Sequence, residues 1–261
     1  MSDDHLHIAL IQADLVWEDA HANRRRFEQL FSKLPGETEL VVLPEMFSTG
    51  FSMNVGQLAE IMGGESSEWM KKQASRLQMV IAGSLIVRDG NSFFNRFVFA
   101  RPEGVIEYYD KRHLFSMGEE HLHFTPGSER KIFRIKSFRI LPQVCYDLRF
   151  PVFCRNHGEY DLMINCANWP ASRSDVWTTL LKARAIENQV YVAGVNRTGT
   201  DGNGIRYHGH SMIVDPRGKE IAETMNSGEQ IIAAKLSKSS LDRFRKKFPV
   251  LPDADDFTIH R

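Results

Sequence analysis

The sequence has no surplus of charge and few cysteines. Its 261 residues include 33 Lys and Arg against 33 Asp and Glu, so the formal net charge is +0. Proteins that bind nucleic acid usually carry a basic surplus that meets the phosphates, so this balance argues against nucleic acid as a partner. The three cysteines are too few, and odd in number, for a disulfide framework. We therefore expect a reducing compartment, in which a special cysteine would be a reactive thiol.

The sequence also lacks a membrane signature. No segment approaches the roughly 18 consecutive apolar residues that a spanning helix needs, so no membrane partner is expected. The first residues, Met1-Ser2-Asp3-Asp4, are acidic and show no leader pattern, which predicts a cytoplasmic protein. Repeats and linker-like tracts are absent, and the length suffices for a sizeable core. We expect one domain over residues 1–261.

Short apolar runs alternate with amphipathic stretches along the chain. Phe27, Leu30, Phe31 and Leu34 recur at helical spacing, a second helix is expected to begin at Ser66 or Ser67, and a third spans about 174–188. Alternation in both halves, with consecutive strands between them, predicts the α/β class without saying whether there are one or two sheets. Strands are expected at 6–13, 40–43, 79–87, 93–100, 105–109, 139–144, 160–167, 190–196, 210–215, 219–224 and 230–234.

Three polar residues each follow one of the expected apolar strands. They are Glu45, Lys111 and Cys145. Because ligands gather at the carboxyl ends of strands in open α/β sheets, these side chains could converge from distant positions. A carboxylate, an amine and a thiol are the groups needed for nucleophilic acyl chemistry. Taken singly, each has an ordinary alternative: an ion pair or helix cap, a solvated charge and an inert buried thiol.

Four segments, three of which contain these residues, carry a family resemblance. They are Leu43-Pro44-Glu45, Tyr109-Asp110-Lys111-Arg112-His113-Leu114-Phe115, Cys145-Tyr146-Asp147-Leu148-Arg149-Phe150-Pro151 and Ala183-Arg184-Ala185-Ile186-Glu187-Asn188-Gln189. These segments resemble motifs of the nitrilase, or carbon-nitrogen hydrolase, superfamily, and the resemblance covers nearly the whole chain. It implies a Glu45-Lys111-Cys145 triad without a cofactor. It also implies an α-β-β-α sandwich of two mixed sheets, paired in a homodimer as a four-layer block.

The triad roles also have a physical basis. A thiol is mostly protonated at pH 7 and must be activated by a neighbouring base or cation. Glu45 could take the thiol proton and later return it to departing ammonia. Lys111 and the backbone N–H of Tyr146 could stabilise the negative charge that develops on the substrate oxygen. Water would then attack the thioester, and no histidine is required.

The resemblance implies a second carboxylate in the loop after the lysine. Glu119 and Glu120 are both candidates, and the spacing to Pro126-Gly127 favours Glu120. Its role would be to orient Lys111 and help to place the substrate. The ordinary alternative is an acidic residue of a surface loop.

Within the superfamily the chain looks most like the omega-amidase branch, at residues 45–51, 111–117 and 168–170. That branch is taken to hydrolyse small-molecule amides, 2-oxoglutaramate and 2-oxosuccinamate, to keto acids and ammonia. The substrate carboxylate needs a cation, for which Arg149 is the candidate, although a structural ion pair with Asp147 or with a sheet-end carboxylate is an equal alternative. The apolar wall is expected to include Phe51, Phe115, Tyr146 and Trp169, with Phe47 and Met117 as further candidates.

The sequence is also compatible with other functions. The chain could be another enzyme of the superfamily, such as an N-carbamoyl-amine hydrolase, another aliphatic amidase or a nitrilase. It could also be a non-catalytic binding protein of the same fold. No metal is expected, because the pairs His121/His123 and His208/His210 lack a third ligand at a recognisable spacing. Cys154 and Cys166 are interpreted as packing thiols.

Overall fold

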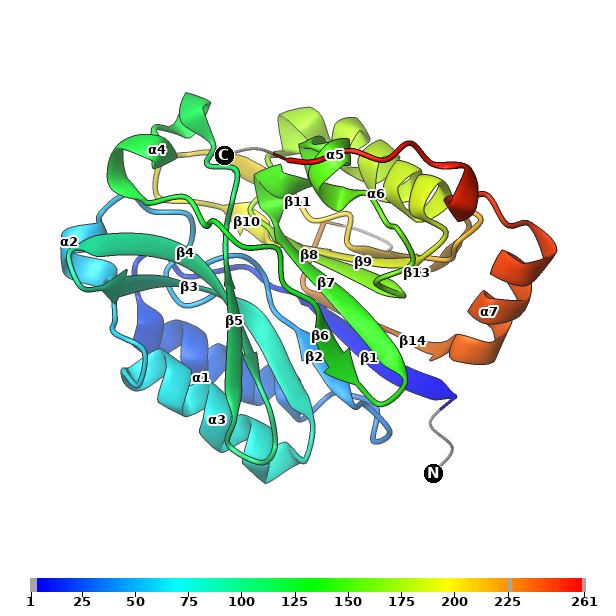
Figure 1. Ribbon diagram of the computed structural model, residues 1–261. Coiled ribbons are helices and arrows are strands. Elements are labelled where there is room, and N and C mark those ends of the chain that lie inside the picture. The colour runs from blue at the N-terminus through cyan, green and yellow to red at the C-terminus, as the bar shows by residue number, and fades with distance from the viewer. Residues whose placement is uncertain (1–3, 225–226, 260–261) are drawn as a thin grey trace.

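The computed structural model describes residues 4–224 and 227–259. Residues 1–3, on which the expected absence of a leader partly rests, lie outside these ranges. In the described part, two six-stranded sheets pack face to face, and helices cover their outer faces (Figure 1). This arrangement confirms the expected α-β-β-α sandwich of two mixed sheets. No helix of the described residues is long and apolar enough to cross a membrane.

The first sheet gathers the N-terminal half of the chain and one late strand. Its order is β14-β1-β2-β3-β4-β5. The central pairs β1–β2 and β2–β3 are parallel, and the outer pairs are antiparallel. The sheet is therefore mixed, and the carboxyl ends of the three parallel strands β1, β2 and β3 reach the same edge. In this order the strands span Gln230–Ser237, His5–Gln12, Leu40–Val42, Val80–Asp89, Ser92–Ala100 and Ile106–Asp110.

The second sheet has the order β13-β12-β9-β8-β7-β6 and repeats the same design. Its central pairs β7–β8 and β8–β9 are parallel. The strands span Glu220–Glu223, Met212–Val214, Tyr191–Asn196, Leu162–Ala167, Phe138–Val144 and Phe133–Ile135. A separate two-stranded ribbon pairs β10 with β11, which span Thr198–Thr200 and Arg206–His208.

Helices α1 and α3 cover the first sheet, and α5 and α6 cover the second (Figure 1). The helix predicted over about 174–188 is confirmed, whereas the helix that contains Phe27 ends at Phe31, before the expected Leu34. The α-helices α1 to α7 span Ala20–Phe31, Val55–Leu58, Glu65–Leu77, Glu120–His123, Pro151–Cys154, Ser174–Asn188 and Lys238–Lys247. Short 3-10 helices η1 to η4 span Ser116–Gly118, Cys145–Arg149, Ala171–Arg173 and Leu251–Asp253.

Side-chain alternation along the strands explains the layers. In β1, Leu6, Ile8 and Leu10 belong to the core between the two sheets. The intervening Ala9 and Ile11 belong to the core between the first sheet and helices α1 and α3. Successive side chains of a strand point to opposite faces, so a run that is apolar throughout fits a sheet that is covered on both sides.

One predicted helix start is wrong. The helix α3 begins at Glu65, with Gly64 rather than Ser66 or Ser67 at the N-cap position. The Ser66 hydroxyl and backbone N–H instead donate to the Glu60 carboxylate, so this serine is already engaged inside the first turn. The predicted turn at 89–91 is confirmed, because β3 and β4 form a hairpin there.

A buried carboxylate ties the second sheet to the C-terminal helix. Asp161 lies just before β8 with its side chain fully buried. It accepts hydrogen bonds from Arg139 of β7 at 2.9 and 3.0 Å and from Arg245 of α7 at 2.8 Å. Burial alone would raise the pKa of Asp161, but Arg139 and Lys238 lower it below the ordinary value. Because α7 directly follows β14, this contact links elements of both sheets.

We expect Asp161→Asn to destabilise the protein by about 3 kcal/mol at neutral pH, because both arginines lose a buried charged partner. A lowered folded pKa stabilises the protein above the ordinary value of 3.8 and ceases to do so as the pH falls through the folded pKa. The difference between the two proteins should therefore shrink at pH 3. Urea unfolding at pH 7 and pH 3 measures it, with the exposed Asp256→Asn as control. Equal stability at pH 7 would contradict the assignment.

Candidate active site

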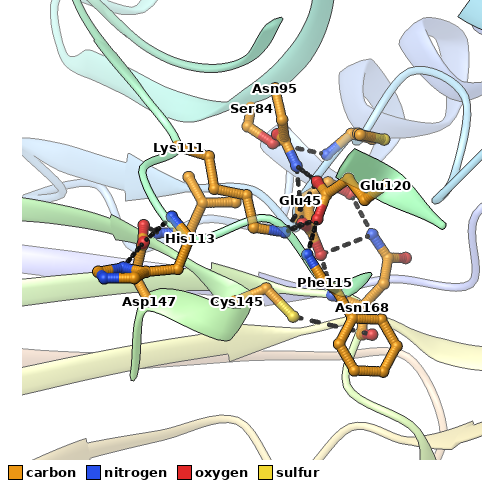
Figure 2. A network of polar contacts seen from close by, with 12 residues as sticks. Glu45, Ser84, Asn95, Lys111, His113, Phe115, Glu120, Cys145, Asp147 and Asn168 are labelled. Atoms are coloured by element: carbon orange, nitrogen blue, oxygen red, sulfur yellow. Dashed lines mark hydrogen bonds and ion pairs between the residues drawn. The ribbon is translucent and has the colours of Figure 1, made fainter. Parts of the chain in front are cut away.

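The polar residues expected at strand ends meet on one side of the sandwich. Glu45 lies shortly after β2, Lys111 directly after β5, and Cys145 directly after β7. A fourth residue, Asn168, follows β8. Figure 2 shows the Lys111 ammonium beside the carboxylates of Glu45 and Glu120, with the Cys145 thiol pointing to the same region. The predicted convergence is therefore present in the fold.

The Lys111 ammonium is held by two carboxylates in a dry environment. Its Nζ donates to Glu45 Oε1 at 2.9 Å and to both carboxylate oxygens of Glu120 at 2.9 Å. All three side chains are fully buried. Burial alone would lower the pKa of Lys111, but the charges of Glu120 and Glu45 raise it well above its ordinary value. The lysine therefore carries a fixed positive charge at neutral pH.

Neutral donors complete the carboxylate contacts. Asn95 Nδ2 donates to Glu45 Oε1 at 2.8 Å and to Glu120 Oε1 at 3.1 Å. The Asn168 backbone N–H donates to Glu45 Oε2 at 2.8 Å, and the Phe115 backbone N–H donates to Glu120 Oε2 at 2.6 Å. Each carboxylate oxygen thus has a partner, which is what makes burial of these charges tolerable.

The protonation balance follows from these charges. Burial raises the pKa of Glu120, an effect that Lys111 opposes and Glu45 reinforces. Burial also raises the pKa of the Cys145 thiol well above its ordinary value; Glu45 adds to this increase, and Lys111 acts against it. The resting site therefore holds a neutral thiol. A thiolate forms there only if a neighbouring base takes the proton as the sulfur reacts.

Cys145 stands on a sharp turn between strand and helix. Its φ is 45°, in the left-handed region, which costs a residue with a side chain roughly 1 kcal/mol or more. The Asp147 carboxylate, fully buried, holds this turn by accepting from the Val144 backbone N–H at 3.0 Å. It also accepts from the Tyr109 hydroxyl at 2.8 Å and the His113 backbone N–H at 3.0 Å. The contacts connect the cysteine turn to both flanks of the lysine.

The strand end that carries Lys111 is fixed from the other side as well. The Gly127 backbone N–H donates to the Lys111 carbonyl oxygen at 2.8 Å. A Cβ atom at position 127 would lie 2.0 Å from the Asp110 carbonyl oxygen, so only glycine allows this approach. The Pro-Gly pair that marked the loop in the sequence therefore has a packing reason.

A cavity of about 680 Å³ opens beside the thiol and the lysine. Its volume suits a small organic ligand. The residues predicted as substrate contacts all line it, and they are Phe51, Phe115, Tyr146, Arg149 and Trp169. Met117 also lines the cavity, with 82% of its surface exposed.

The structure decides two questions that the sequence leaves open. Phe47 does not reach the cavity, because it is fully buried against Phe27 and Trp69 in the core under α1 and α3. In the described chain Arg149 forms no ion pair with Asp147, whose oxygens contact the Tyr109 hydroxyl, the His113 imidazole and backbone N–H groups instead. The alternative of a structural ion pair for Arg149 is therefore wrong.

The structure also distinguishes Glu119 from Glu120 and places the other two cysteines. Glu120 is the residue that contacts Lys111, whereas Glu119 is exposed. Cys154 and Cys166 are fully buried in the cores on either side of the second sheet. Within residues 4–224 and 227–259, no group of three or more His, Cys, Asp or Glu side chains could hold a metal ion.

Three members of this polar network are not predicted as site residues from the sequence. Asn95 is a buried amide within the apolar run of β4, and that contrast is a usable signal. Asn168 follows an apolar strand, as Glu45, Lys111 and Cys145 do, so the same rule applies to it. Asp147 is predicted only as an alternative partner for Arg149, because its contacts to Tyr109 and His113 depend on the fold.

Comparison with known proteins agrees with this geometry. The carbon-nitrogen hydrolase family model matches residues 7–246. The chain is 45% identical to Omega-amidase YafV of Escherichia coli K12, over 97% of this chain and 98% of the relative. It is 35% identical to 2-oxoglutaramate amidase of Bacillus subtilis, over 94% and 96% of the two chains.

Solved structures match with the same coverage. A CN-hydrolase superfamily protein of Xanthomonas campestris, with an arsenic adduct in its active site, superposes with a TM-score of 0.95 at 44% identity, covering 98% of this chain and 99% of its own. Nit3 of Saccharomyces cerevisiae, a member of the nitrilase superfamily, gives 0.84 at 26% identity, covering 95% of each chain. With a family match over most of its length and full-length relatives at 45% and 35% identity, this chain belongs to the carbon-nitrogen hydrolase family.

Proposed function

We propose that the protein is a thiol amidase that hydrolyses the omega-amide of 2-oxoglutaramate, and of 2-oxosuccinamate, to the keto acid and ammonia. The observation that carries this proposal is the free thiol of Cys145 beside the buried Glu45-Lys111-Glu120 cluster, in a cavity of ligand size. The relatives named omega-amidase and 2-oxoglutaramate amidase, which match over nearly their full length, support the substrate class.

In the first half-reaction, Cys145 attacks the amide carbon while Glu45 takes the thiol proton. The carbonyl oxygen becomes negative and is stabilised by the Lys111 ammonium and the Tyr146 backbone N–H. Glu45 then gives the proton to the amide nitrogen, the carbon–nitrogen bond breaks, and ammonia leaves. The raised pKa of the thiol favours this coupled transfer over a preformed thiolate.

In the second half-reaction, water attacks the thioester carbon and Glu45 accepts a proton from that water. The carbon–sulfur bond breaks, the thiol regains its proton, and the acid product leaves. Glu120 is a positioning residue in this scheme, because its carboxylate binds Lys111 with both oxygens. The three groups supply base, nucleophile and electrostatic stabilisation, so the proposed reaction needs no cofactor.

The cavity wall supports a small, flat, anionic substrate. Phe51, Phe115 and Trp169 offer apolar faces, and Arg149 offers a cation for the carboxylate. An N-carbamoyl-amine, a simple aliphatic amide or a nitrile lacks the keto acid end that would use this cation. Those substrates, and a non-catalytic role, are the alternatives that the experiments below test.

We further propose a single domain over residues 1–261, a cytoplasmic location and a homodimer. Support for the dimer comes from two exposed apolar side chains that line one surface hollow. Val152 of α5 is 55% exposed, and Phe257 of the C-terminal segment is 43% exposed. Neighbouring exposed apolar residues are typical of a protein interface.

A substrate panel tests the activity. We expect ammonia release from 2-oxoglutaramate and 2-oxosuccinamate with kcat/KM at least about 100-fold above that for uncharged N-carbamoyl amines, nitriles and neutral amides, because those lack a carboxylate for the cationic wall. Steady-state kinetics with coupled ammonia detection measures this ratio. The proposal would be wrong if the enzyme hydrolysed another class of amide efficiently and did not hydrolyse the keto acid amides.

Removal of the thiol tests the mechanism. Cys145→Ala should lower kcat for 2-oxoglutaramate by about 10⁴-fold or more, because no covalent intermediate can form. Circular dichroism and the unfolding midpoint should stay near the wild-type values, since the side chain is small and borders the cavity. The buried Cys154→Ala serves as the matched control and should retain activity. Substantial hydrolysis by Cys145→Ala would refute the assigned nucleophile.

The role of Glu120 has its own signature. Glu120→Gln should reduce kcat by about 100-fold, because Lys111 loses its doubly bonded partner and shifts. Glu120 helps to raise the pKa of Lys111, so the variant should lose activity at a lower alkaline pH than the wild type. The pH profile of kcat/KM measures this shift, and Glu119→Gln is the neighbouring control. An unchanged alkaline limb would contradict the positioning role.

A further inference from the structure

Two arginines of the cavity carry charge that no acidic side chain neutralises. Arg149 and Arg173 both line the cavity and are partly buried. In the described part of the chain, neither guanidinium forms an ion pair or a side-chain hydrogen bond. Lys111, the third cation of the cavity, is fully engaged by Glu45 and Glu120. The two arginines are therefore the cations left for a ligand.

Aromatic rings hold both guanidinium groups in place. The Arg149 guanidinium carbon lies 5.1 Å from the Trp169 ring centroid, and that of Arg173 lies 5.5 Å from the Phe115 ring centroid. A cation–π contact orients a guanidinium without using its planar set of N–H donors. These donors therefore remain available for a carboxylate, which an arginine can bind through two parallel hydrogen bonds.

The same rings connect the arginines to the reacting groups. The Trp169 indole N–H donates to the Arg173 carbonyl oxygen at 2.9 Å, so this ring contacts both arginines. The Phe115 ring packs edge-on against Tyr146, the neighbour of Cys145, with centroids 5.1 Å apart. Because the Phe115 backbone also donates to Glu120, the guanidinium of Arg173 has a fixed relation to the catalytic cluster.

Two acidic residues of the cavity, Asp201 and Glu18, have partners of their own, and a third, Glu119, is exposed. Asp201 accepts from the Tyr207 hydroxyl at 2.8 Å and from the Asn203 backbone N–H at 2.9 Å. Glu18 accepts from the Ser52 hydroxyl at 2.5 Å. Helix α6 begins directly after Arg173, so the positive end of its dipole adds to the same field. An anion at the two arginines thus meets positive potential from several sources.

We propose that Arg173 is a specificity-determining residue that, together with Arg149, binds the carboxylate end of the substrate. The ligand class is a short monoamide whose far end is a planar carboxylate, with the adjacent keto oxygen as a further acceptor. This assignment rests on the proposed function for the identity of the amide. The anion site itself depends only on the two unpaired guanidinium groups.

The test compares an anionic with a neutral amide. Arg173→Met should lower kcat/KM for 2-oxoglutaramate by about 10- to 100-fold, mainly through KM, because charge-assisted hydrogen bonds are lost. The value for neutral pentanamide should fall much less, so that the ratio of the two drops at least tenfold. Arg173→Lys should recover part of the ratio, since it restores charge without the planar fork. A drop below tenfold overturns the proposal.

The control separates this role from structural damage. Arg217 also lies over an aromatic ring, Phe244, at 4.3 Å, but it lies outside the cavity. Arg217→Met should leave the ratio at the wild-type value. The Trp169 bond to residue 173 uses its backbone carbonyl and is retained in Arg173→Met. Equal losses in the two variants would assign the effect to general destabilisation and overturn the proposal.

Binding distinguishes a failure of this inference from a failure of the proposed function. Calorimetry measures the affinity of Cys145→Ala and of Cys145→Ala/Arg173→Met for 2-oxoglutaramate, without turnover. We expect at least tenfold weaker binding in the double variant. If the wild type fails to hydrolyse 2-oxoglutaramate yet this difference is found, the anion site stands and the proposed reaction is wrong. If the wild type hydrolyses it and the affinities agree within tenfold, the Arg173 assignment is wrong.

Discussion

The buried Lys111 ammonium between Glu45 and Glu120 is the interaction on which the site depends. Moving an ion from water into a protein interior costs several kcal/mol, and attraction offsets this cost only with good geometry and further donors. Here Asn95 and the Asn168 backbone N–H supply such donors to the carboxylates. The two sheets must therefore bring their strand ends together for this group of charges to be stable. The stability of the fold and the chemistry of the site therefore both require that the buried Lys111 charge be paired with Glu45 and Glu120.

A second constraint is the backbone of the cysteine turn. The left-handed φ of Cys145 is unfavourable by itself. The Asp147 carboxylate stabilises this backbone conformation by accepting a hydrogen bond from Val144, at the end of the preceding strand. Asp147 also binds Tyr109 and His113, which flank the lysine. The buried Asp147 carboxylate therefore fixes both the thiol and the ammonium, although it forms no ion pair with Lys111. Such contacts maintain a backbone conformation at the reactive residue that its own φ/ψ preference disfavours.

The sequence predicts most of the fold, because long apolar runs and helical spacing record which faces are buried. It does not predict β6, β10 and β11, because a polar residue or glycine interrupts each of these three-residue strands, whereas the equally short β2 and β12 are apolar throughout. It predicts the Glu45, Lys111 and Cys145 cluster from strand ends and motifs. It leaves a side chain's surroundings open where they depend on distant segments, as for Phe47, which could line the cavity or lie in the core and is found in the core.

Charge is used in two different ways within one cavity. Next to the thiol, the Lys111 charge is paired and dry, which fixes its position and keeps it ready for an oxygen that becomes negative only during the reaction. Farther along the wall, Arg149 and Arg173 rest on aromatic rings and keep their charge unpaired. The substrate carboxylate is already charged in the ground state. An unpaired arginine can bind it without first breaking an existing ion pair. In the proposed reaction the paired charge therefore serves the transition state, and in the proposed anion site the unpaired charges bind the substrate carboxylate.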